Sequence, residues 1–95
     1  MHTIDDERNP EWDPIKADAN YQKHGVRFSE AATVLFDELA VTVEDTRFGE
    51  QRFVTIGRSA EGGTLVVVYT WRGDRVRLIS AREATPKERR VYEDG

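Results

Sequence analysis

The spacing of apolar residues changes part-way along the chain, from a helical period to the period of two that is typical of strands, and the first part predicts two helices. The first helix spans about residues 14–24. Asp13 is a good N-cap for it, Pro14 suits the first helical position, and Gly25 favours a stop. A second, short helix is predicted to begin at a cap on Ser29. Its apolar residues at helical spacing are Phe28, Ala32, Leu35 and Leu39.

The second part of the chain is rich in Val, Ile, Thr and aromatic residues, and it predicts four strands joined by short turns in an antiparallel meander. The predicted strands are residues 41–45, 51–58, 64–71 and 75–81. A last helix is predicted from Thr85, which forms a capping box with Glu88, to about Tyr92. The predicted fold class is α+β, with two N-terminal helices, a four-stranded antiparallel sheet and a C-terminal helix. We expect one domain over residues 11–95, behind a polar N-terminal leader of residues 1–10.

A two-residue turn between the third and fourth strands sets the register of the predicted sheet. This register puts Arg52, Thr70 and Arg77 in one row across three strands. The arginines at that end of an otherwise apolar face are Arg52, Arg72, Arg75 and Arg77. The same register puts Arg82 on the opposite face, which we expect the helices to cover.

The distribution of charge along the chain adds one feature to this prediction. The chain of 95 residues has a net charge of −4, yet residues 51–95 hold nine basic and six acidic side chains. Of the 14 basic residues in the whole chain, 11 are arginine, whose planar fork suits phosphate. With no cysteine and two histidines, neither a metal site nor a cofactor is expected. No apolar run is long enough for a membrane span, so we expect a cytoplasmic protein without a membrane partner.

Each of these observations has a simpler structural interpretation. The arginines at the sheet end are equally well explained as a network of ion pairs with Glu and Asp side chains. His24 beside Lys23 at the end of the first helix is a capping side chain or, alternatively, a general base. Arg89 and Arg90 on the last helix form a solvated face or a second cluster for phosphate.

Several blocks of the chain in fixed order resemble the BrnT toxin family, the toxin half of BrnT/BrnA type II toxin–antitoxin modules. These blocks include Glu11-Trp12-Asp13-Pro14, Lys23-His24-Gly25-Val26, Gly49-Glu50-Gln51-Arg52-Phe53, Ile79-Ser80-Ala81-Arg82 and Glu88-Arg89-Arg90-Val91-Tyr92. The resemblance implies a RelE-like ribonuclease fold and a BrnA-like antitoxin that neutralises the toxin. It also implies a complex that represses its own operon through the antitoxin's DNA-binding domain, with a homodimer of the toxin inside that complex.

From this resemblance and the arginine pattern we expect a ribonuclease toxin that cleaves RNA without a metal ion and inhibits translation. The residues expected to hold the phosphate and the transition state are Arg52, Arg72 and Arg77, with Arg82 added because its block resembles the family's functional segment. His24 is the expected general base or acid, with Lys23 as its electrostatic neighbour and Glu50 as the second choice of base. The residues expected to bind RNA outside the catalytic set are Arg58, Arg75, Arg89 and Arg90. The alternative is a non-enzymatic protein that binds its partner as a co-repressor or scaffold.

Overall fold

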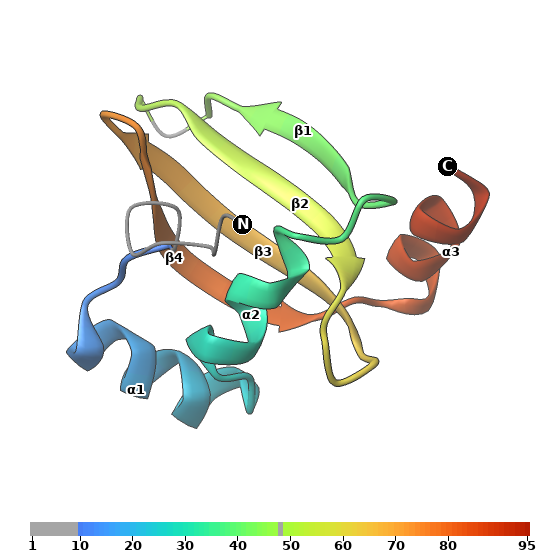
Figure 1. The fold of residues 1–95 in the computed structure, drawn as a ribbon, viewed down its shortest axis with the longest axis horizontal. Coiled ribbons are helices and arrows are strands. Elements are labelled where there is room, and N and C mark those ends of the chain that lie inside the picture. The colour runs from blue at the N-terminus through green and yellow to red at the C-terminus, as the bar shows by residue number, and fades with distance from the viewer. Residues whose placement is uncertain (1–9, 48) are drawn as a thin grey trace, which may run out of the picture.

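The computed structural model describes residues 10–47 and 49–95, which form an α+β fold with a four-stranded antiparallel sheet (Figure 1). The helices are α1 (Pro14–His24), α2 (Phe28–Val34) and α3 (Pro86–Asp94). The strands are β1 (Val41–Asp45), β2 (Arg52–Arg58), β3 (Thr64–Arg72) and β4 (Arg75–Glu83), in the spatial order β1-β2-β3-β4. The predicted fold class is confirmed. Except for Pro10, the predicted leader lies outside the described residues.

Local signals set the ends of two helices as predicted. The Asp13 side chain accepts a hydrogen bond of 2.9 Å from the Ile15 N–H at the start of α1. Gly25 follows α1 in the left-handed conformation, with a φ of 72°. At the start of α3, the side chain of Thr85 accepts from the Glu88 N–H, and the Glu88 side chain accepts from the Thr85 N–H. These caps are local in sequence, which is why they were predictable.

The predicted start of α2 is wrong. The helix begins at Phe28, with Arg27 in the cap position and no side-chain hydrogen bond to the cap, whereas the prediction placed a cap at Ser29. Phe28 is only 2% exposed and packs edge-on against Trp12, with ring centroids 6.1 Å apart. Burial of Phe28 in the core therefore sets this helix start, and the capping preference of serine does not.

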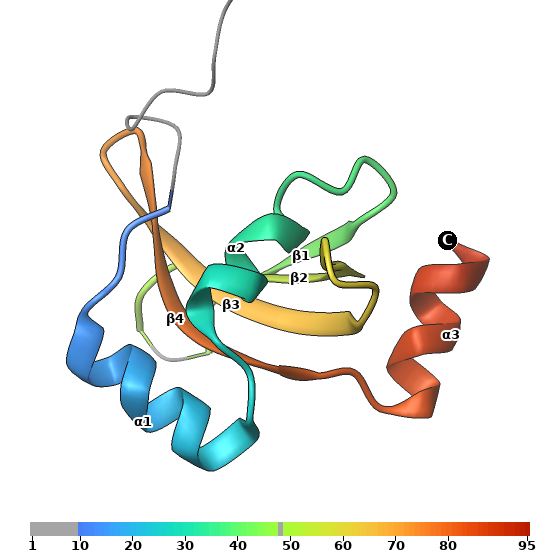
Figure 2. The ribbon, with the colours of Figure 1, turned by 60° about the horizontal axis from the view of Figure 1, so that its bottom comes forward.

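Helices α1 and α2 lie on the same face of the sheet, and α3 stands apart from them at the other end of the molecule (Figures 1 and 2). The core lies between α2 and this helix-covered face. Its buried residues include Phe28, Ala31, Val34, Leu65, Val67, Leu78 and Ala81. The side chain of Asn20 on α1 is buried and bonds both the N–H and the carbonyl of Ala81, which ties α1 to β4.

The hairpin between β3 and β4 contains a β-bulge that the sequence did not predict. The pairs Arg72–Arg75 and Thr70–Arg77 next to the turn are as predicted. Further along, Tyr69 pairs with Leu78 while Val68 pairs with Ser80, so Ile79 is the extra residue. The predicted pairs of Val68 with Ile79 and of Val66 with Ala81 are therefore wrong. Because Val66 instead faces Arg82, the bulge moves Arg82 from the predicted helix-covered face to the open face.

Two further contacts complete the sheet and its surroundings. Before α1, the Glu11 N–H donates to the Val76 carbonyl and the Leu78 N–H donates to the Glu11 carbonyl, so this segment lies along β4.

Beside β2, the backbone N–H of Arg58 and the hydroxyl of Tyr92 on α3 both donate to Asp37 Oδ2, at 2.8 and 2.7 Å. These bonds lower the pKa of Asp37. None of the helices in the described part of the chain is long and apolar enough to cross a membrane.

Candidate functional site

The open face of the sheet carries a groove of about 400 Å³ with an apolar floor and a charged rim. The floor consists of Val54, Ile56, Val66 and Val68. The rim consists of Asp45, Arg47, Arg52, Ser80, Arg82 and Glu88. Strands β1, β2 and β4, the β1–β2 connection and α3 all contribute to this rim. A concave surface that combines an apolar floor with converging charged groups is the usual form of a ligand site.

Arg82 lies at one side of this groove and is held by a carboxylate of α3. Its Nη1 and Nη2 donate to Glu88 Oε1 and Oε2, both at 2.8 Å, and the side chain of Arg82 is 41% exposed. This double hydrogen bond lowers the pKa of Glu88 to about 2 and raises the pKa of Arg82. The guanidinium is therefore charged and oriented in the folded protein.

Arg52 and Arg47 form the other charged side of the groove. Arg52 Nε donates to Glu50 Oε1 at 3.1 Å, and Arg52 also lies opposite Asp45 in the register of β1 and β2. Arg47 donates to both oxygens of Asp45, with Nε–Oδ1 at 2.9 Å and Nη2–Oδ2 at 2.7 Å. These bonds from Arg47 lower the pKa of Asp45 to about 2. The rim is thus a set of guanidinium–carboxylate pairs around an apolar floor.

The other arginines of the predicted cluster do not line the groove. Arg75 and Arg77 share the carboxylate of Glu11, at 3.5 and 3.2 Å. Arg72 lies at the start of the β3–β4 turn, opposite Arg75. Arg77 remains in the predicted row with Arg52, with β3 between them, but its contact with Glu11 places it on the β4 side of the sheet. The predicted cluster of four is therefore divided between the groove and the β4 edge.

The remaining predicted site residues also lie outside the groove lining. Lys23 and His24 end α1, the helix that Asn20 ties to β4. At the end of β2, the guanidinium of Arg58 lies 5.9 Å from the centre of the Tyr92 ring. The two arginines predicted on the last helix, Arg89 and Arg90, are exposed on α3.

Sequence reasoning missed four charged residues that the structure brings to these arginines. They are Glu11, Asp45, Arg47 and Glu88. The capping box placed Glu88 at the start of the last helix, but nothing in the sequence showed that it faces Arg82. In the described residues, no group of three His, Asp or Glu side chains is arranged to hold a metal ion.

A family model described as the ribonuclease toxin BrnT of type II toxin–antitoxin systems matches residues 12–88, which include every residue of the groove rim. The chain belongs to the BrnT toxin family. Membership in the BrnT family makes it a ribonuclease toxin of a type II system and implies an antitoxin partner. The match favours the toxin over the alternative of a non-enzymatic co-repressor or scaffold.

A solved structure supports the fold. The chain is similar to the crystal structure of the ribonuclease toxin BrnT of Brucella abortus, with a TM-score of 0.66 and 23% sequence identity. The alignment covers 82% of this chain and 97% of that chain. At this identity the similarity concerns the fold alone, and the RelE-like description stays a prediction. A search of curated proteins found no match.

Proposed function

We propose that the groove on the open face is where this BrnT-family toxin binds and cleaves RNA. The observation that carries the proposal is that Arg52 from β2 and Arg82 from β4 line two sides of one apolar-floored groove, which the bulge at Ile79 makes possible. In this proposal Arg52 and Arg82 hold the scissile phosphate, and Arg47 binds a neighbouring one. The side chains of Arg52 and Arg82 are partly exposed, so N–H groups that do not bond the carboxylates are available to phosphate oxygens.

The proposed reaction uses the ribose 2′-hydroxyl as the nucleophile. A general base takes its proton, the 2′-oxygen attacks phosphorus, and the 5′-oxygen leaves and takes a proton from solvent, which gives a 2′,3′-cyclic phosphate. The guanidinium groups stabilise the extra charge on the phosphoryl oxygens, so the scheme requires no metal ion. Glu50 is our proposed base, because its carboxylate contacts Arg52 at the groove.

The other predicted residues lie outside the groove lining, and most of them are assigned to binding RNA on either side of the cleaved phosphate. Arg72, Arg75 and Arg77 extend the same strand face toward the β3–β4 turn, where they serve to bind flanking RNA. At the opposite end of the sheet, flanking RNA is bound by Arg58, which ends β2, and by Arg89 and Arg90 on α3. Lys23 and His24 are not assigned to the reacting phosphate, because they end α1 on the helix-covered face (Figure 1), whereas the groove lies on the open face.

We also propose the wider biological setting that the BrnT family suggests. Cleavage of RNA in the cytoplasm inhibits translation, and the antitoxin neutralises the toxin. The toxin reaches operator DNA only through the antitoxin, and it forms a homodimer within the complex.

Incubation of the purified, antitoxin-free toxin with RNA tests the proposed chemistry. We expect cleavage that EDTA does not reduce, with products that end in a 2′,3′-cyclic phosphate. Arg52→Gln and Arg82→Gln should each lower kcat/KM by about 100-fold, the effect of removing one donor to a developing negative charge. Arg27→Gln is the matched control, since Arg27 stacks on Tyr21 at 4.2 Å, away from the groove.

The proposal fails if the groove variants and the Arg27 control cleave RNA equally well. Loss of cleavage in EDTA that added Mg²⁺ restores would contradict the metal-independent scheme while leaving the location of the site intact. Thermal unfolding of each variant separates a loss of chemistry from a loss of fold.

A further inference from the structure

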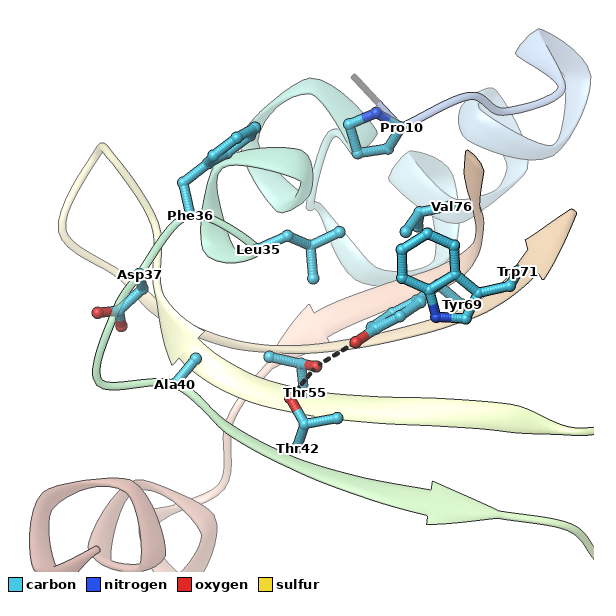
Figure 3. A pocket seen from close by; sticks show the side chains of 10 residues that line it. All are labelled: Pro10, Leu35, Phe36, Asp37, Ala40, Thr42, Thr55, Tyr69, Trp71 and Val76. Atoms are coloured by element: carbon cyan, nitrogen blue, oxygen red, sulfur yellow. Dashed lines mark hydrogen bonds between the residues drawn. The ribbon is translucent and has the colours of Figure 1, made fainter. Parts of the chain in front are cut away.

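A second concave surface lies on the helix-covered face, where the helices leave part of the sheet open. It encloses about 310 Å³. Figure 3 shows Leu35 and Phe36 on one side of it and Trp71 and Val76 on the other. Phe36 and Trp71 are 50% and 51% exposed, so each presents half of a large aromatic side chain to solvent. Exposed aromatic side chains around a hollow are typical of a protein-binding surface.

The floor of this aromatic pocket is polar and crosses three strands. Thr42 Oγ1 and Thr55 Oγ1 are 2.7 Å apart, and Thr55 Oγ1 and the Tyr69 hydroxyl are 2.9 Å apart (Figure 3). Thr55 and Tyr69 are buried, whereas Thr42 is exposed at the β1 side. The chain of hydroxyls therefore ends at the edge of the sheet, where a partner can reach it.

Strand β1 is that edge, and β2 is its only neighbour in the part of the sheet that the structure describes. Its outer side presents backbone N–H and C=O groups, which can pair with an added strand. The side chains of β1 include the 57% exposed Val43 and the acidic pair Glu44 and Asp45. A second copy of β1 in parallel, in-register pairing would bring these carboxylates close to one another, which disfavours that mode of self-association.

The charge around the aromatic pocket selects the chemistry of the partner. Asp37 lines the pocket. The exposed side chain of Glu38 lies next to Asp37 in the chain, and that of Glu44 lies two positions along β1 from Thr42. The positive side chains of an extended segment with lysine or arginine would complement this negative charge. The half-exposed faces of Phe36 and Trp71 also favour a cationic side chain through cation–π contact.

We propose that an extended, lysine- or arginine-bearing segment of the cognate antitoxin adds to the outer edge of β1 and places a side chain between Phe36 and Trp71. The partner follows from membership of the BrnT family, and the docking site does not depend on where RNA is cleaved. Because β1 contributes Thr42 to the aromatic pocket and Asp45 to the RNA groove, the bound segment lies beside the groove without filling it.

Charge reversal at the acidic border tests the proposal in the full-length toxin. Glu38→Lys/Glu44→Lys is the test pair, and Glu61→Lys/Glu93→Lys is a control pair with the same change in net charge at exposed positions. We expect the test pair to weaken binding of the purified antitoxin by about tenfold or more and the control pair by less than about threefold. RNA cleavage by the free toxin should be the same in both, which separates this proposal from that of the RNA site.

Hydrogen exchange of the wild-type complex supplies a second measurement that needs no variant. Strand addition should slow the exchange of those backbone amides of Val41–Asp45 that point away from β2 when the antitoxin binds. Equal loss of affinity in the two charge-reversal pairs would overturn the proposal. Unchanged exchange of these amides in the complex would overturn it as well.

Discussion

Arg82 on β4 and Glu88 on α3 are joined by two parallel hydrogen bonds of 2.8 Å, across the end of the groove on the open face of the sheet. Glu88 also accepts the Thr85 N–H, so the same carboxylate caps α3 and holds the guanidinium. No residue of α3 is buried, so this contact and the hydrogen bond from Tyr92 to Asp37 are central to holding the helix in place. The orientation of Arg82 and the position of α3 therefore depend on each other.

Glu88→Gln separates the two roles of this carboxylate, because glutamine keeps an acceptor for the Thr85 N–H and loses the charge. If Glu88 positions Arg82 for the reaction, kcat should fall several-fold, since the guanidinium loses its fixed orientation. KM for RNA should fall as well, because a negative charge leaves the groove rim. Single-turnover cleavage over a range of enzyme concentrations measures both effects. A variant with unchanged kcat and KM would show that Glu88 supports α3 only.

The stability supplied by Glu88 should depend on pH. Its pKa is lowered from the ordinary value of 4.5 to about 2, so the folded state binds this proton less readily than the unfolded state. The stabilisation is therefore present above about pH 4.5 and is lost as the pH falls toward 2. Urea unfolding of the wild type and of Glu88→Gln should give different free energies at about pH 7 that converge near pH 2. A difference that is constant over this range would contradict the prediction.

Asn20→Ala should destabilise the fold strongly. The Asn20 amide donates to the Val26 and Ala81 carbonyls at 3.0 and 2.9 Å, and its oxygen accepts from the Ala81 N–H at 3.1 Å. Its removal leaves buried backbone groups without partners, at a cost of about 2–4 kcal/mol. Urea unfolding measures this cost, and Gln22→Ala on the exposed side of α1 is the control. If the two variants lost the same free energy of unfolding, water would be replacing the hydrogen bonds of the Asn20 amide.

Gly57→Ala should also destabilise the protein, through packing. A Cβ at Gly57 would lie 2.9 Å from Val34 Cγ1 and 3.0 Å from Ala40 Cβ, closer than such atoms normally approach. Because Val34 is fully buried, α2 must shift to relieve this close contact. We expect the free energy of unfolding to fall by about 1–3 kcal/mol. Gly63→Ala is the matched control, since its Cβ would meet ordinary contacts of 3.7 Å and longer. Similar melting temperatures for the two variants would argue against the clash.

Apart from the bounds of α2, which runs from Phe28 to Val34, the secondary structure of this protein was predictable because its signals are local. Asp13 and Thr85 cap helices through residues two and three positions away, and Gly25 ends α1 through its own backbone conformation. The β3–β4 turn likewise set the nearest pairs, Arg72–Arg75 and Thr70–Arg77. The resemblance to the BrnT family was also readable from the sequence, and the family match over residues 12–88 confirms it.

The composition of the groove was decided only by the tertiary structure. The bulge at Ile79 changes which face Arg82 occupies, and a bulge depends on how a strand fits its partner as well as on its own residues. At the groove, Asp45, Glu50 and Glu88 lie two to six positions from the arginines that they meet, whereas at the β4 edge Glu11 reaches Arg77 from 66 positions away. Contacts of this kind follow from packing between elements. The sequence thus determined which elements form and how many arginines they carry, while packing decided which arginines share one site and with which carboxylates.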